Sequence, residues 1–201
     1  MMHSNALLIF IKNPELGKVK TRLAAGLGDE KALQIYLQLQ EMTRNLALQL
    51  DCKRYLFYSD SIDHTDNWLT EAFDKQIQAG GDLGQRMSRA FGSALMHHKK
   101  VVIIGSDCPE INVDIINTAF EKLDQNDIVI GPAKDGGYYL LGMKSFSPQL
   151  FEDITWSSNQ VLHQTLDKIE QIGKTVDFCP ILSDLDDIKD WEMLKNKFEW
   201  L

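Results

Sequence analysis

Short apolar runs alternate with longer segments of helical periodicity along almost the whole chain, and this alternation constrains the fold more than any other feature. Residues 6–11 are continuously apolar, as expected of a strand that is covered on both faces of a sheet. Residues 29–50 then carry apolar side chains at steps of three or four, which predicts an amphipathic helix. Further strands are predicted at residues 55–58, 76–78, 101–104, 128–130, 138–141 and 175–178, and further helices at residues 66–72, 83–98, 112–123, 157–169 and 188–198. The pattern predicts βαβ units around a mostly parallel sheet, and therefore an α/β fold of three layers, α/β/α.

The bulk properties narrow the class of protein. No internal repeat or linker divides the 201 residues, so residues 1–201 are predicted to form a single domain. A net charge of −8 argues against nucleic acid or an anionic membrane as a partner, although a local basic cluster can still bind one small phosphorylated ligand. Three widely spaced cysteines indicate neither a disulfide framework nor a zinc site, and suit a reducing compartment. With only six apolar residues in a row near the N-terminus, the sequence predicts a cytoplasmic protein.

A cluster of basic residues follows the first predicted strand, where ligands bind in open α/β sheets. The stretch "KNPELGKVKTRL" places Lys12, Lys18, Lys20 and Arg22 around Gly17. Lysine supplies a point charge to phosphates and arginine a bidentate fork, so we expect a phosphate cradle here. A solvated basic loop explains the same residues. The spacing of a Walker loop is absent.

A glycine-rich stretch, "AGGDLGQRM", precedes the helix predicted at residues 83–98. Gly81 would let the backbone approach a ligand closely, and Arg86 follows on the helix, so Gly81, Asp82 and Arg86 are candidate nucleotide-binding residues. The alternative, a glycine turn with Asp82 as the helix N-cap, is favoured by this stretch alone.

Acidic residues supply a candidate metal site. The strand of "VVIIGSDCPEI" ends at Asp107, where a carboxylate can hold Mg²⁺ or Mn²⁺. In "LSDLDDIKDW", Asp184 and Asp186 alternate on one face of an extended segment, and Asp187 can cap the following helix. We therefore expect Asp107, Asp184 and Asp186 to share a metal ion. The alternatives are a turn aspartate at residue 107 and an acidic helix start at residue 187, and neither accounts for Asp184.

The stretch "GPAKDGGYYLLG" joins two predicted strands through Asp135, Gly136 and Gly137. Asp-Gly is a common signal for a hairpin turn, and this alternative is strong. In a functional interpretation, the paired glycines and Tyr138 admit the sugar or acceptor group of a ligand, and Asp135 is a candidate general base for an acceptor hydroxyl.

Together these stretches resemble a known family, the bacterial glycosyltransferase-like proteins known as radical-SAM/selenodomain-associated transferases. The stretches that carry the resemblance are "KNPELGKVKTRL", "GGDLGQRM", "GSDCP", "GPAKDGGYYLLG", "TWSS" and "DLDDIKDW", which span residues 6–195 approximately. The resemblance implies membership of the nucleotide-diphospho-sugar transferase superfamily, with a Rossmann-like GT-A fold whose first half binds the nucleotide. It also implies that Asp107 is the metal-binding aspartate.

The same layout is similar to 2-phospholactate guanylyltransferase and, more distantly, to the molybdenum-cofactor guanylyltransferase. This similarity pairs the basic stretch with Lys12, Lys20 and Arg22, and pairs a late D-x-D with Asp184 and Asp186. At residues 105–107 the chain carries one acid, where many GT-A glycosyltransferases show D-x-D. That departure favours nucleotidylyl transfer.

The sequence thus predicts a Mg²⁺- or Mn²⁺-dependent transferase that uses an activated nucleotide, with Asp107, Lys20 and Asp135 as catalytic residues. Its partners would be a nucleotide sugar or a nucleoside triphosphate together with a small-molecule acceptor. Glycosyl transfer is placed first by a small margin, nucleotidylyl transfer to a phosphorylated molecule second, and a catalytically idle nucleotide-binding protein third. The sequence does not identify the base of the nucleotide, the sugar or the acceptor. Trp191 and Trp200, expected to be exposed near the C-terminus, would allow a homodimer.

Overall fold

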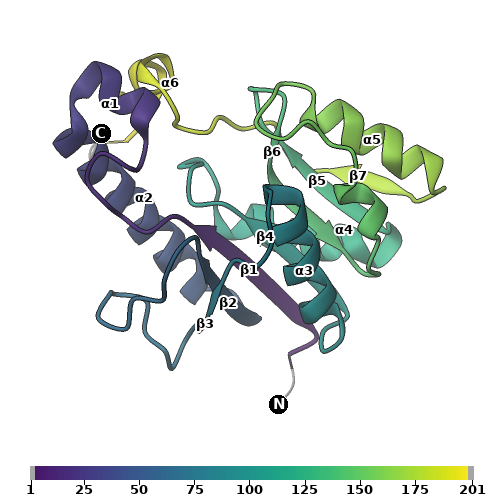
Figure 1. Ribbon diagram of the computed structural model, residues 1–201. Helices are drawn as coiled ribbons and strands as arrows, with labels where there is room; N and C mark the ends of the chain where they lie inside the picture. The colour runs from purple at the N-terminus through teal and green to yellow at the C-terminus, as the bar shows by residue number, and fades with distance from the viewer. Residues whose placement is uncertain (1–2, 199–201) are drawn as a thin grey trace.

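A seven-stranded sheet forms the centre of the computed structural model, which describes residues 3–198 (Figure 1). The strands are β1 (Asn5–Ile11), β2 (Lys53–Tyr58), β3 (Asp74–Ile77), β4 (Lys100–Ile104), β5 (Ile128–Pro132), β6 (Tyr138–Met143) and β7 (Val176–Phe178). Their order is β3-β2-β1-β4-β6-β5-β7. Strand β6 runs antiparallel to β4 and β5, and the remaining pairs are parallel.

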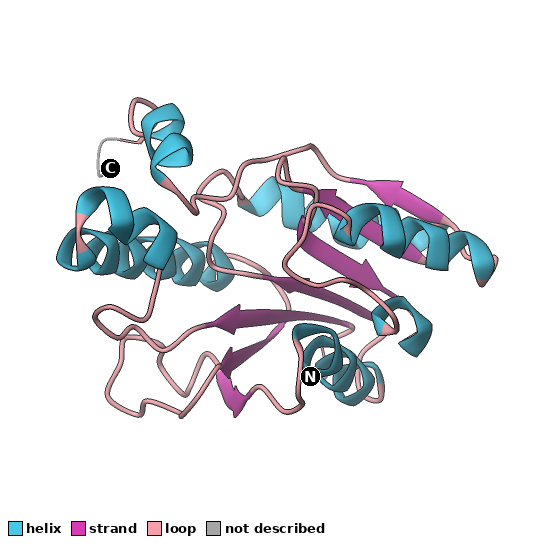
Figure 2. Ribbon diagram, turned by 45° about the horizontal axis from the view of Figure 1, so that its top comes forward, coloured by secondary structure: helices cyan, strands magenta, loops and turns pink. Residues whose placement is uncertain are grey.

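Helices cover both faces of this sheet (Figures 1 and 2). Helices α2 (Asp29–Leu48) and α4 (Val113–Gln125) pack on one face, whereas α3 (Leu83–Leu95), the 3₁₀ helix η1 (Pro148–Phe151) and α5 (Val161–Gln171) pack on the other. The core clusters differ accordingly: Ile116 and Phe120 of α4 belong to one, and Met87 and Phe91 of α3 to the other. The predicted three-layer α/β/α arrangement is confirmed.

Two short helices, α1 (Thr21–Leu27) and α6 (Ile188–Leu194), lie side by side beyond the main layers (Figure 1). Gly26 leaves room for Ile188, whose side-chain carbons would lie 3.2 Å from a Cβ at residue 26. A small buried cluster that includes Leu23 and Leu185 joins the two helices to α2. This packing brings the basic loop before α1 next to the acidic segment before α6, although more than 160 residues separate Lys20 from Asp186.

Several local predictions are wrong. Residues 66–72 form turns instead of a helix, because the Asp66 carboxylate accepts hydrogen bonds from the Trp68 N–H and from Lys75 Nζ. The helix expected from residue 157 begins at Val161: Gln160 is the N-cap of α5 without a side-chain bond, and Ser157 lies in the preceding loop. Helices α3 and α6 end three or four residues earlier than expected, at Leu95 and Leu194.

The N-caps named in the sequence analysis are confirmed: Asp82 and Asp187 accept bonds from backbone N–H groups of α3 and α6. Asn112 caps α4 in the same way. The three cysteines are buried and free of disulfides. In residues 3–198 no helix is both long and apolar enough to cross a bilayer.

The expectation of exposed C-terminal aromatics is not met at Trp191. This side chain packs against the buried cluster of α1, α2 and α6, and Lys195 Nζ lies 4.7 Å from its ring centroid. Trp200 lies outside the described residues. The homodimer therefore stays a prediction without a surface to support it.

Candidate active site

A cavity of about 760 Å³ opens at the carboxyl ends of β1 and β4 and the start of β6. This is the edge of the sheet at which α/β proteins of this kind bind ligands. Nine of the predicted site residues line it: Lys12, Lys20, Arg22, Asp107, Asp135, Gly137, Tyr138, Asp184 and Asp186. Residues from both ends of the sequence therefore meet in one place, as the argument from strand ends requires.

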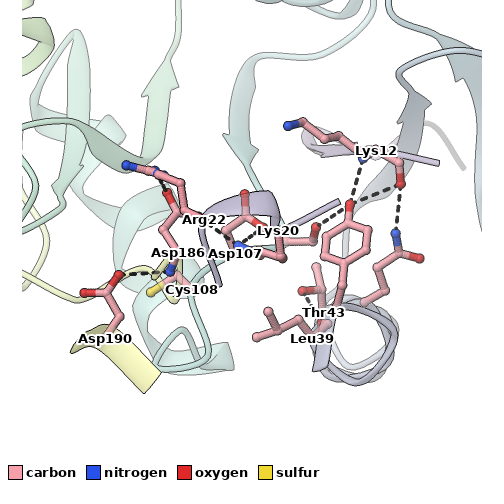
Figure 3. A network of polar contacts seen from close by, with 12 residues as sticks. Lys12, Lys20, Arg22, Leu39, Thr43, Asp107, Cys108, Asp186 and Asp190 are labelled. Carbon is pink, nitrogen blue, oxygen red and sulfur yellow. Dashed lines mark hydrogen bonds and ion pairs between the residues drawn. The ribbon is translucent and has the colours of Figure 1, made fainter. Parts of the chain in front are cut away.

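A buried ammonium group lies at the centre of the cavity. The Lys20 side chain is 4% exposed, and its Nζ lies 2.6 Å from Asp107 Oδ1 and 2.9 Å from Asp186 Oδ1 (Figure 3). Burial opposes the charged form, but the two carboxylates outweigh it and raise the pKa of Lys20 above its ordinary value. Lys20 is therefore a fixed positive charge at neutral pH.

The backbone at Lys20 is also unusual. Its φ of 48° places it in the left-handed region at the N-cap of α1, where non-glycine residues are uncommon. Arg22 follows in the first turn and donates from Nη2 to Asp186 Oδ2 at 2.5 Å. Asp186 is thus held by two cations, which outweigh the effect of its burial and keep its pKa below the usual range.

Asp184 differs from Asp186 although they are two residues apart. Burial raises the pKa of Asp184 to about 7, and the nearby carboxylates of Asp107 and Asp186 act in the same direction. Asp135 adds to this effect, whereas Lys20 opposes it. The cavity therefore carries more negative charge than its own cations neutralise.

The donors fit a hard divalent cation in chemical type. Asp107, Asp184 and Asp186 offer only carboxylate oxygens, the ligands that Mg²⁺ and Mn²⁺ prefer. In the part of the chain that the structure describes, no group of three His, Cys, Asp or Glu side chains is arranged to hold a metal ion. Lys20 supplies the positive charge between Asp107 and Asp186, so a metal at these carboxylates requires its ammonium to move.

A buried tyrosine that the sequence analysis missed supports the basic loop. Tyr36 Oη accepts a hydrogen bond from the Lys12 N–H (2.8 Å) and donates to the Lys12 carbonyl (3.1 Å). Gln40 Nε2 donates to the same carbonyl at 3.0 Å, and Ser106 Oγ donates to Tyr36 Oη at 3.4 Å. Tyr36 thereby connects the loop after β1 to the loop that carries Asp107. A tyrosine and a glutamine four positions apart on an amphipathic helix are the signal that could have found it.

The remaining predicted residues lie outside the cavity lining, namely Gly17, Gly81, Asp82, Arg86 and Gly136. Asp82 caps α3 by accepting from the Gln85 N–H. Arg86 approaches the Gln78 side chain at 3.5 Å. Gly136 has a φ of 91° in the turn between β5 and β6, which is the hairpin that Asp-Gly signals. At Asp82 and Gly136 the structure therefore shows the alternatives named in the sequence analysis, an N-cap and a hairpin turn.

The loop 155–159 contributes residues that the sequence analysis did not single out. Trp156, Ser157, Ser158 and Asn159 all line the cavity, and the Asn159 carbonyl lies against Gly136, next to Asp135. The stretch "TWSS" entered the sequence analysis only through the family resemblance.

The comparison with family models finds a match over residues 42–158 to DUF2064, described as an uncharacterized protein conserved in bacteria. The chain belongs to this family. Among curated proteins, nothing matches the DUF2064 chain. It is 31% identical to a proposed nucleotide-diphospho-sugar transferase from Desulfovibrio desulfuricans G20, with a TM-score of 0.90 over 98% of this chain and 88% of the other.

More distant structures share the fold of the DUF2064 chain. One is CMP:2-keto-3-deoxy-manno-octonic acid synthetase complexed with CTP, with 8% identity and a TM-score of 0.59 over 96% and 98% of the two chains. Another is Rv0371c of Mycobacterium tuberculosis H37Rv in complex with manganese, with 10% identity and a TM-score of 0.55 over 97% and 100%. The expected fold of the nucleotide-diphospho-sugar transferases is confirmed, and nucleotidyltransferases share it.

Proposed function

We propose that this DUF2064 protein is a metal-dependent transferase that uses an activated nucleotide. The observation that carries the proposal is the meeting of a basic loop with four carboxylates in one cavity at the carboxyl end of the sheet. Lys12, Lys20 and Arg22 would bind the phosphates, and Asp107 with Asp184 and Asp186 would hold Mg²⁺ or Mn²⁺. When bound, the metal supplies charge neutralisation for the phosphates as negative charge develops on the leaving group.

The chain's own residues would orient and neutralise the substrate. Lys20 pairs with Asp107 and Asp186 in this structure, and in the nucleotide complex we expect its ammonium to shift toward the phosphates. Asp135 also lines the cavity, where it can take a proton from an acceptor hydroxyl. In glycosyl transfer, our first candidate, that hydroxyl attacks the sugar carbon and a nucleoside diphosphate leaves. The resemblance to the radical-SAM/selenodomain-associated transferases supports this candidate.

Nucleotidylyl transfer is the second candidate. A phosphorylated acceptor would attack the α-phosphate of a nucleoside triphosphate, and pyrophosphate would leave. The single acid in residues 105–107, the basic loop and the similarity to 2-phospholactate guanylyltransferase favour it. So does the fold shared with a synthetase that binds CTP. A catalytically idle nucleotide-binding protein would keep the cavity but would show no turnover.

Thermal-shift measurements with Mn²⁺ test this function. Each nucleoside triphosphate and a set of nucleotide sugars would be added at about 100 times the dissociation constant, which adds roughly 2.7 kcal/mol, or about 5–10 °C in Tm. A shift with a nucleotide sugar but not with the matching triphosphate supports glycosyl transfer, and the converse supports nucleotidylyl transfer. The Asp107→Asn variant should lose the metal-dependent shift. Asp51→Asn, at a carboxylate that is 99% exposed and outside the cavity, should keep it. A wild-type protein that no nucleotide stabilises would refute the proposal.

A further inference from the structure

One wall of the cavity is formed by an indole ring packed against a helix backbone. A Cβ at Gly84, in the first turn of α3, would lie 2.5 Å from Trp156 Nε1 and 2.6 Å from Cε2. Only glycine therefore leaves room for Trp156 at this position. Leu83, 43% exposed, and Met87 line the cavity beside it. The result is an aromatic and apolar shelf.

The loop that carries Trp156 is held firmly in place. The Thr155 N–H donates to Gln164 Oε1 at 2.7 Å, and Ser158 Oγ donates to the Thr155 carbonyl at 2.6 Å. Ser157 adopts a φ of 60°, the left-handed region that a non-glycine residue enters at an energetic cost. Strained residues that the surrounding structure enforces are concentrated at functional sites, which directs attention to this loop.

Polar groups with unused hydrogen-bonding capacity surround the shelf. Asp135 accepts from the Gly137 N–H through Oδ1, which leaves Oδ2 without a partner among residues 3–198. In the same described residues, the Ser157 hydroxyl has no hydrogen-bond partner, and Asn159 is engaged only through Oδ1. Carboxylate, hydroxyl and amide together can both accept and donate, as hydroxyl groups of a ligand require.

The charge at this wall favours a neutral group over a second anion. Within the described chain, the lysines and arginine that line the cavity all belong to the basic loop, namely Lys12, Lys20 and Arg22. Beside the shelf stands the carboxylate of Asp135. A phosphate placed beside Asp135 would meet like charge, whereas a neutral ring would not.

We propose that Trp156, Ser157, Asn159 and Asp135 form a subsite for an uncharged ring that bears several hydroxyl groups, a pyranose or a cyclitol. The C–H face of the ring packs on the indole, and its hydroxyls bond the polar rim. The subsite deepens the proposed function and rests on it, because it supplies the second substrate group of the transfer. The ring can come from two sources, the sugar of a nucleotide donor or a separate polyol acceptor.

Calorimetry in the presence of Mn²⁺ distinguishes these sources in two arms. The first arm compares Kd for UDP-glucose with UDP and for GDP-mannose with GDP, so that the ratio isolates the gain from the sugar. The second arm measures Kd for myo-inositol and methyl glucoside on protein saturated with nucleoside triphosphate. Both arms use the wild type, Trp156→Ala, Trp156→Phe, and Phe146→Ala as a control at an exposed aromatic outside the cavity lining.

In one arm, we expect the ring to increase the affinity of the wild type. In Trp156→Ala this increase should be roughly tenfold smaller, since aromatic packing contributes on the order of 1 kcal/mol. Trp156→Phe should recover part of it, and Phe146→Ala should keep it whole. A gain in the first arm assigns the ring to the donor, and a gain in the second assigns it to the acceptor. Three results would overturn the subsite: the ring increases affinity as much in Trp156→Ala as in the wild type, Trp156→Ala loses affinity for UDP itself to the same extent, or the ring gives the wild type no increase in affinity. These outcomes all require nucleotide binding by the wild type, so its absence refutes the proposed function instead.

Discussion

The hydroxyl of Tyr36 offers the sharpest test of how the phosphate loop is positioned. The side chain is 2% exposed, and Tyr36→Phe removes one oxygen while it keeps the ring and its packing. The Lys12 N–H then loses its acceptor, whereas the Lys12 carbonyl keeps Gln40. A partly buried donor left without a partner costs about 1–3 kcal/mol, and the lost Ser106 bond adds a smaller amount. We expect a loss of roughly 2–3 kcal/mol in the free energy of unfolding, or about 5–10 °C in Tm for a chain of this length.

Thermal and urea unfolding would measure this loss beside a matched variant, Tyr55→Phe. Tyr55 Oη makes one bond, to His98 Nε2 at 3.0 Å, at a half-buried site away from the cavity. Its removal should cost about 1 kcal/mol or less. Because Lys12 would lose its fixed position, Tyr36→Phe should also weaken Mn²⁺-nucleotide binding, and Tyr55→Phe should not. Equal destabilisation by the two variants, or unchanged nucleotide affinity in Tyr36→Phe, would contradict the positioning role.

Further outcomes follow from charge and from backbone geometry. Since the pKa of Asp184 is raised in the folded state to about 7, ionisation costs stability as pH rises from about 4 to 7. Asp184→Asn in EDTA should therefore gain stability over the wild type as the pH rises across that range, by up to about 4 kcal/mol at pH 8, since each pKa unit corresponds to about 1.4 kcal/mol. A constant difference in urea titrations from pH 4 to 8 would refute this. Gly136→Ala should destabilise by about 3 kcal/mol or more, because the new Cβ collides with the Asn159 carbonyl, whereas Gly173→Ala, with similar φ strain but open space, should cost about 1 kcal/mol; unfolding curves that rank them the other way would be decisive. Lys20→Ala should weaken triphosphate binding in calorimetry more than nucleoside binding, and equal loss for both would remove its phosphate role.

Most of the layered fold could be predicted because it depends on local patterns. Continuous apolar runs predicted β1 and β4, and steps of three or four predicted α2. Asn112 could be assigned as a cap because its side chain bonds a backbone group only three residues away. Residues 66–72 failed for the opposite reason. Their pattern is helical, but the Asp66 carboxylate pairs with Lys75 of the neighbouring strand, a contact that the local sequence does not reveal.

The interior of the site depends on pairings that no local pattern encodes. The sequence predicted that Lys20 and Asp186 would share a site, but not that the ammonium would stand between two carboxylates. Tyr36 could not be singled out from its helix alone, because its hydrogen-bond partner Lys12 lies 24 residues away in the sequence. Trp156 lay in a loop where the absence of a side chain at Gly84 decides its place.

The charges that line the cavity explain why a nucleotide would need a metal here. Among the described residues, three cations (Lys12, Lys20 and Arg22) and four carboxylates line the cavity. Lys20 forms ion pairs with two of these carboxylates. A triphosphate adds about four negative charges to a cavity that has no positive charge to spare. Burial is the main cause of the raised pKa of Asp184, and the neighbouring carboxylates add to it, so this carboxyl is shifted toward its neutral form. In the proposed function, Asp107, Asp184 and Asp186 would hold a divalent cation, which would supply positive charge to the phosphates and would favour the ionised form of Asp184. The Lys20 ammonium, which pairs with Asp107 and Asp186 in this structure, would then be free to move toward the phosphates.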